Sequence, residues 1–104
     1  MTRDLRLNCE LDGTTAEVVI DGELDMAGAF RLEPAIERVV SESRVDELVF
    51  DLAGVSFMDS AGLGSLLSSH ERLKDLGIKA RVTRPSRAVE RVLDSTGTRG
   101  VLLD

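Results

Sequence analysis

The residues best suited to chemistry lie together in residues 51–64, Asp-Leu-Ala-Gly-Val-Ser-Phe-Met-Asp-Ser-Ala-Gly-Leu-Gly. Asp59 supplies a carboxylate and Ser60 a hydroxyl, and Gly62 and Gly64 follow shortly after them. Glycine is a poor helix former, so what it offers here is access to the backbone. We therefore predict a small exposed surface that another molecule approaches closely. On this basis, exchanging Gly62 for valine should weaken binding more than folding.

A catalytic centre does not fit this stretch. Met58 and Gly62 flank Ser60 where a nucleophile elbow of the Gly-x-Ser-x-Gly type has two glycines. His70, the single histidine, follows ten residues later on the same predicted helix, about 15 Å away at the helical rise per residue. We expect no catalytic residue and no enzymatic activity.

Nucleotide and metal sites are disfavoured as well. The chain has no Gly-Lys-Ser/Thr sequence, and Asp59 places negative charge where a phosphate needs positive charge. One histidine and one cysteine provide no spacing that a transition metal would select. We therefore expect neither a metal site nor a cofactor-binding residue.

The candidate surface must be positioned by a strand and a helix. Residues 47–52 are an apolar run typical of a buried strand, and leucines recur at helical spacing after Ser60. Asp59 or Ser60 can cap this helix, because a side-chain oxygen there accepts from N–H groups that lack a partner in the first turn. Leu76 and Gly77 are typical of a left-handed helix end.

The remaining elements follow from alternation, turns and helical stripes. Apolar residues alternate in residues 5–11 and 16–20 around Asp12-Gly13, which predicts an antiparallel hairpin. On this pattern Cys9 lies on the apolar side of the first strand, as a buried small hydrophobe. An apolar stripe predicts a helix from Met26 to about Glu42. Pro34 lies inside that stripe, so the helix either bends there or begins there, and we favour a bend.

The C-terminal part predicts a strand at residues 78–82, a short helix after Pro85 and a final strand at residues 101–103. The order is then β-β-α-β-α-β-α-β. Each later strand follows a helix, so right-handed crossovers give a mostly parallel mixed α/β sheet of four to five strands, with about three helices and one antiparallel edge.

Composition limits the class of protein further. The chain of 104 residues, with 42% hydrophobic and 31% charged residues, suits one domain over residues 1–104. A net charge of −6 argues against a nucleic-acid partner. No apolar run is long enough for a membrane span, and the N-terminus lacks the hydrophobic region of a signal peptide. We expect a cytoplasmic protein that does not insert into a membrane.

Residues 57–64, Phe-Met-Asp-Ser-Ala-Gly-Leu-Gly, resemble the Asp-Ser-Ser/Thr-Gly-Leu-Gly signature of the STAS domain family in its bacterial anti-sigma factor antagonist branch. Gly22-Glu23-Leu24-Asp25 also resembles the Gly-x-Leu-Asp that follows the second strand of STAS domains. The order of elements matches the same fold, so the resemblance covers nearly the whole chain. Ala61 departs from the pattern, because it replaces the second hydroxyl of the signature.

The resemblance implies a phosphoprotein that acts by partner switching in transcription regulation. The serine after the aspartate is the kinase target in that branch, which places the phosphorylation site at Ser60. The implied partners are an anti-sigma factor with serine kinase activity and a serine phosphatase. The implied partner-binding residues are Asp25, Met58, Asp59, Ser60, Ala61, Gly62, Leu63 and Gly64.

Two functions are compatible with these residues. In the first, the unphosphorylated protein binds the anti-sigma factor, which releases a sigma factor, and phosphorylation of Ser60 ends the binding. In the second, the protein is a STAS subunit of a membrane transport or lipid-trafficking complex and needs no phosphorylation. The intact Asp59-Ser60 pair favours the first. Weak nucleotide binding, which some STAS domains show, also stays open.

Overall fold

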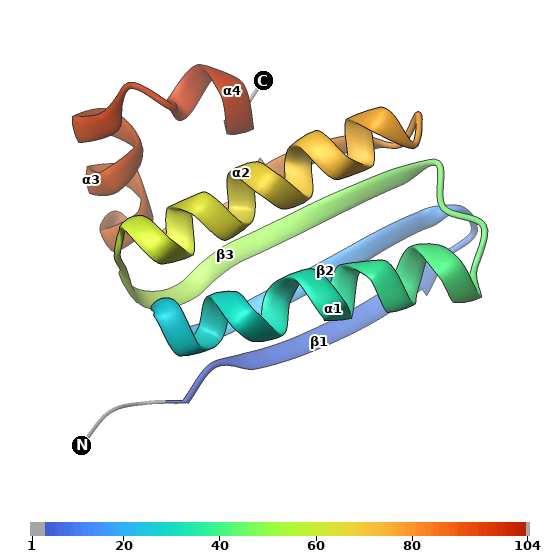
Figure 1. Ribbon diagram of the computed structural model, residues 1–104, viewed down its shortest axis with the longest axis horizontal. Helices are drawn as coiled ribbons and strands as arrows, with labels where there is room; N and C mark the ends of the chain where they lie inside the picture. The colour runs from blue at the N-terminus through green and yellow to red at the C-terminus, as the bar shows by residue number, and fades with distance from the viewer. Residues whose placement is uncertain (1–3, 104) are drawn as a thin grey trace.

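The computed structural model describes residues 4–103 and is organised around a mixed sheet of four strands in the order β1-β2-β3-β4 (Figure 1). The strands are β1 (Arg6–Asp12), β2 (Thr15–Leu24), β3 (Glu47–Met58) and β4 (Lys79–Thr83). β1 and β2 form the predicted antiparallel hairpin, while β3 pairs in parallel with both β2 and β4. Gly13 adopts a φ of +63° in the hairpin turn, a conformation that glycine tolerates well. The predicted mixed α/β sheet is confirmed.

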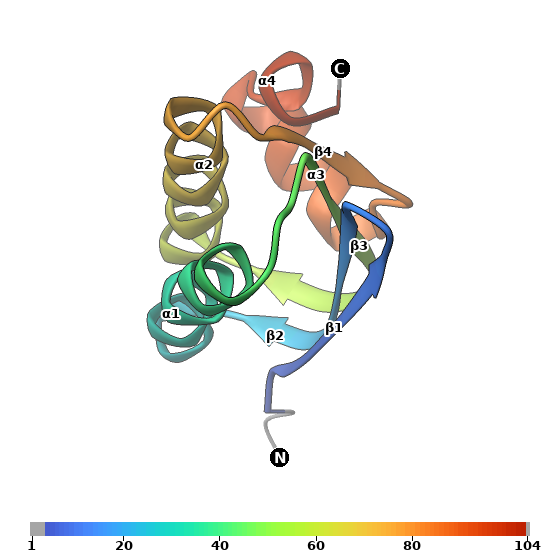
Figure 2. The ribbon, with the colours of Figure 1, turned by 90° about the vertical axis from the view of Figure 1, so that its right-hand side faces the viewer.

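Two long helices, α1 (Met26–Glu42) and α2 (Ser60–Asp75), lie side by side on one face of the sheet (Figures 1 and 2). α1 is one helix that continues through Pro34, so the alternative in which the helix begins at that proline is wrong. Leu32 and Ile36 of α1 and Leu66 and Leu73 of α2 are buried in the core. The helical stripes therefore supply the apolar cover that the inner strands need.

β3 is longer than the sequence indicated, since it runs to Met58 and not to Leu52. The pairing with β2 shifts register twice, and each shift places one extra residue in β3. Asp51, itself buried, accepts a hydrogen bond from the Ala53 amide at 3.1 Å at the first irregularity. A bulge changes the face toward which the following side chains point, so simple alternation fails along this part of the strand.

The hairpin strand β1 is less covered than expected. Cys9 is exposed, so its predicted burial is wrong. The reason is its position on the outermost strand, where α1 covers the apolar side only in part: Leu7 is half-buried and Leu11 is 49% exposed. The partial burial that Cys9 does have raises the pKa of its thiol.

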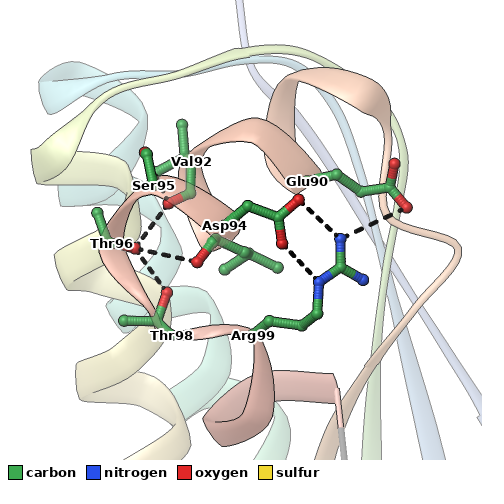
Figure 3. Close-up of polar contacts among 8 residues, drawn as sticks. Glu90, Val92, Asp94, Ser95, Thr96, Thr98 and Arg99 are labelled. Atoms are coloured by element: carbon green, nitrogen blue, oxygen red, sulfur yellow. Dashed lines mark hydrogen bonds and ion pairs between the residues drawn. The ribbon is translucent and has the colours of Figure 1, made fainter.

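The C-terminal segment is helical, so the predicted strand at residues 101–103 is wrong. α3 (Arg87–Thr96) packs against β3, and α4 (Arg99–Leu103) follows a left-handed turn at Gly97. Leu102 is fully buried while Val101 is 52% exposed. Arg99 joins the two helices through hydrogen bonds of 2.7 and 3.2 Å to the Asp94 carboxylate and lies 4.0 Å from Glu90 (Figure 3). A run of three apolar residues is too short to separate a strand from a helical turn.

The first turn of each long helix approaches the strand ends closely. Asp25 and Asp59 cap α1 and α2, and Gly28 and Gly62 occupy the same place in the two first turns. A Cβ atom at Gly62 would overlap the backbone carbonyl of Leu24, the last residue of β2. A Cβ atom at Gly64, by contrast, would meet nothing within 4 Å.

We predict that replacing Arg99 by Gln raises the pKa of Asp94. The Arg99 hydrogen bond lowers that pKa below its ordinary value of 3.8, and the variant loses it. The stability that comes from the pair is present above the ordinary pKa and is lost as the pH falls through the lowered pKa of the folded state. Carboxyl NMR titration of both proteins measures the shift. Equal midpoints for Asp94 in the two proteins would contradict the pairing.

We also predict that replacing Gly62 by Ala destabilises the fold, whereas replacing Gly64 by Ala does not. Overpacking against a backbone carbonyl costs about 1–3 kcal/mol, and each kcal/mol lowers the melting temperature of a domain this small by roughly 4–8 °C. The Gly64 variant should melt at the same temperature or higher, because alanine is the better helix former. Thermal melts of the matched pair decide. Equal melting temperatures would show that the first turn of α2 can move away from β2.

Candidate functional site

The candidate surface is built from two neighbouring strand ends of the same construction. Leu24 and Met58 are register partners at the ends of the parallel strands β2 and β3. Each is followed by an aspartate and then by the first residue of a helix, which is Met26 in α1 and Ser60 in α2. Parallel strands that lie about 4.8 Å apart therefore start two helices beside each other. Ser60 and Met26 occupy equivalent positions on this edge of the sheet.

The two aspartates are engaged as helix caps. Asp25 Oδ1 accepts from the Gly28 amide at 3.0 Å, and Asp59 Oδ1 accepts from the Gly62 amide at 2.9 Å. Both have extended backbone conformations, with φ near −100° and ψ near 180° in the manner of an N-cap. The cap of α2 is thus Asp59 and not Ser60, which settles the choice left open by the sequence.

Because Asp59 performs the capping, the Ser60 hydroxyl is left free. Ser60 is the first residue of α2 and is exposed. Within residues 4–103, the structure shows no hydrogen bond that engages its hydroxyl. A hydroxyl in this position can accept a chemical group without the loss of an internal contact.

The electrostatic setting of Ser60 combines two opposing effects. The N-terminus of a helix favours added negative charge by roughly 0.3–1 kcal/mol. Asp59 and Asp25, both only partly buried, oppose that effect with their own negative charge. An anion is therefore tolerated at Ser60, but the surface does not attract one strongly.

The predicted partner-binding residues divide by exposure. Ser60 and Gly64 are exposed, and Asp25, Asp59 and Ala61 are partly exposed. Three others are buried: Met58, Gly62 and Leu63. The expectation that Gly62 leaves room for a partner is wrong, because that space belongs to Leu24, and Gly62 thus serves the packing of α2 on β2.

The bulged end of β3 explains why Met58 is buried and Phe57 is exposed. The sequence indicated Met58 as the partner contact, but its side chain is 5% exposed and belongs to the core. Phe57 points outward and is 48% exposed. Met26, which the sequence did not single out, is 63% exposed at the start of α1, directly after the neighbouring strand β2 and its capping Asp25. The signal that could have identified Met26 is its position directly after the capping Asp25.

The rest of the described chain offers no competing centre. α2 is one continuous helix from Ser60 to Asp75, so His70 stays about 15 Å from the Ser60 hydroxyl. Residues 4–103 contain no group of three or more side chains that could hold a metal ion. Over the same residues, none of the helices combines the length and the apolar character that crossing a membrane requires.

Known proteins resemble this chain over nearly its whole length. It is 26% identical over 101 residues to an anti-sigma F factor antagonist of Lysinibacillus sphaericus, which covers 94% of this chain and 86% of the relative. An anti-sigma factor antagonist from Mycobacterium paratuberculosis has a similar crystal structure, with a TM-score of 0.78, 30% identity, and 98% of this chain and 87% of that chain covered.

The fold is also that of the anti-sigma factor antagonist SpoIIAA in its unphosphorylated form, with a TM-score of 0.79, 23% identity, and 95% of this chain and 87% of that chain covered. The family model described as the STAS domain matches residues 5–102. This match spans the four strands, the helices α1 to α3, and α4 up to Leu102 in the described structure. The chain therefore belongs to the STAS domain family.

Proposed function

We propose that this protein is an anti-sigma factor antagonist controlled by phosphorylation of Ser60. In its unphosphorylated form it binds an anti-sigma factor that has serine kinase activity, and a sigma factor is released. The kinase then phosphorylates Ser60 and ends the binding, and a serine phosphatase restores it. The protein acts in the cytoplasm by binding and not as an enzyme. The observation that carries the proposal is the free, exposed Ser60 hydroxyl on a rigidly capped helix.

The surroundings of Ser60 support a protein partner. Phe57 and Met26 are large exposed apolar side chains close in sequence to the ends of the neighbouring strands β3 and β2. Buried apolar surface is the main favourable term in protein association, and aromatic residues and methionine are enriched in interfaces. The partly exposed Asp25 and Asp59 add polar contacts at the rim. A partner that covers this surface also covers the Ser60 hydroxyl.

Phosphorylation acts differently on folding and on binding. A phosphoryl group adds about −1.5 to −2 charges. The capped helix already tolerates an anion, so the fold should change little. At an interface, the same charge must lose its water next to Asp59, and an unpaired buried charge costs several kcal/mol. Since about 1.4 kcal/mol is tenfold in affinity, binding should fall by orders of magnitude.

We therefore predict that a kinase-type anti-sigma factor with ATP adds one phosphoryl group, on Ser60. The phosphorylated protein and the Ser60→Asp variant should bind that partner at least about a hundredfold more weakly, while Ser60→Ala should bind well and fail to switch. Ser68 is an exposed serine farther along α2, so Ser68→Asp is the matched control and should bind normally. Mass spectrometry locates the phosphate, and calorimetry with thermal melts separates binding from folding.

Two results would contradict the antagonist function. The first is a phosphate located on Ser56 or Ser65 in place of Ser60. The second is equal affinity of the phosphorylated and unmodified proteins for the partner. The second result would favour a STAS subunit of a transport or lipid-trafficking complex, which uses the same surface without modification.

We also predict that Phe57→Ser and Met26→Ser each weaken binding of the anti-sigma factor by about tenfold or more and leave the melting temperature nearly unchanged. Each removes exposed apolar surface that the partner would bury, worth roughly 1.5–3 kcal/mol when fully covered. Leu76→Ser is the control, since Leu76 is 43% exposed at the other end of α2. If the Leu76 variant weakens binding as much as the other two, the partner does not bind at Ser60.

A further inference from the structure

The outer edge of the sheet at β1 is open. β1 is the first strand in the sheet order, and no strand of residues 4–103 pairs with its outer side. Its seven residues include neither proline nor lysine, and its three charged residues, Arg6, Glu10 and Asp12, are of both signs. The opposite edge is less suited to pairing with another strand, because β4 is shorter, carries Lys79 and Arg81, and is soon followed by Pro85. The backbone of β1 is thus available to another strand whose charges match those of Arg6, Glu10 and Asp12.

A groove lined by apolar and charged side chains runs beside this open edge. Its volume is about 400 Å³, and its lining combines Leu7, Cys9 and Leu11 of β1 and Ala35 and Val39 of α1 with Arg38, Glu42 and Ser43. A second hollow continues from Leu7 and Ala35 to Phe30, which is 76% exposed. An open strand edge and several partly exposed apolar side chains, with Arg31, Arg38 and Glu42 among them, therefore lie next to each other.

The sequence of β1 is complementary to itself when two copies run antiparallel with Cys9 at the centre. Position 6 then faces position 12 of the other copy, so that Arg6 meets Asp12 twice by symmetry. Leu7 likewise meets Leu11, and Asn8 meets Glu10. Neither Arg6 nor Asp12 has an ion-pair partner within residues 4–103. Opposite charges directly across antiparallel strands are favourable, so this register is favoured by charge as well as by shape.

We propose that two copies of this chain associate through β1 in this register and form one continuous sheet of eight strands. The two-fold axis passes between the two Cys9 residues. The backbone of each β1 gains a partner strand, and the leucines of both copies close over the two grooves. Ser60 starts α2 at the end of β3, two strands away from β1, so each copy keeps its Ser60 surface open. The dimer therefore does not depend on the proposed antagonist function.

The first test is the molar mass of the full chain by sedimentation equilibrium from about 5 µM to about 500 µM, a range that covers weak specific interfaces. The wild-type chain should change from monomer to dimer within this range. Arg6→Asp and Asp12→Arg should each weaken the dimer roughly tenfold, because attractive pairs become repulsive twice per dimer. Mixing the two variants should restore the dimer, since the two acidic residues of one variant at positions 6 and 12 then face the two basic residues of the other. Thermal melts check that both variants fold.

The second test is disulfide formation under a mild oxidant. It determines which residues of the two β1 strands lie opposite each other. Asn8→Cys and Glu10→Cys, each combined with Cys9→Ser, should cross-link when mixed and form far less disulfide alone. Directly opposite residues fall within disulfide reach, whereas residues offset by two positions lie about 7–8 Å apart. A monomer over the whole concentration range, a mixture that does not restore association, or equal cross-linking of each variant alone would overturn the proposal. Binding of some other protein at β1 by a chain that stays monomeric would overturn it as well.

Discussion

The structure depends on the close approach between the first turn of α2 and the end of β2. Gly62 lies so near the carbonyl of Leu24 that no side chain fits between them. Asp59 fixes the same turn from the other side by accepting from the Gly62 amide. These two contacts set the start of α2 and hence the place of Ser60. The geometry of the exposed serine is therefore determined by buried backbone, and the exposed side chains around it can vary without moving it.

Most of the fold could be predicted from the sequence because its signals are local. Asp12-Gly13 marks the hairpin, Asp25 and Asp59 mark helix starts, and Gly77 and Gly97 end helices in left-handed conformations. The boundary of β3 could not be predicted in the same way. Its last residues depend on two register shifts against β2, and these arise from pairing between distant segments. The apolar residues 101–103 likewise take a helical form in which Leu102 joins the core and α4 contacts β4, a segment distant in the sequence.

The same distinction explains which site residues could be predicted. The place of Asp59 and Ser60 at the start of α2 could be predicted because a cap and its neighbouring hydroxyl are a local pattern. Met58 was expected at the exposed surface and is buried, because a bulge changes which of two adjacent residues faces the core. Cys9 was misplaced because alternation shows which face a side chain takes and does not show how well that face is covered. Coverage depends on where the strand lies in the sheet, and β1 lies at its edge.

The two equivalent strand ends also determine how many modification states this surface of one chain can have. Both have the same backbone construction, but only one starts its helix with a hydroxyl, since Met26 stands where Ser60 stands in the other. If Ser60 receives a phosphate, this surface is either phosphorylated or unmodified in each molecule, with no intermediate state. A graded response in the cell must then come from the fraction of molecules that carry the phosphate. The sensitivity of such a response is set by the amount of protein and by the relative activities of the enzymes that add and remove the phosphate.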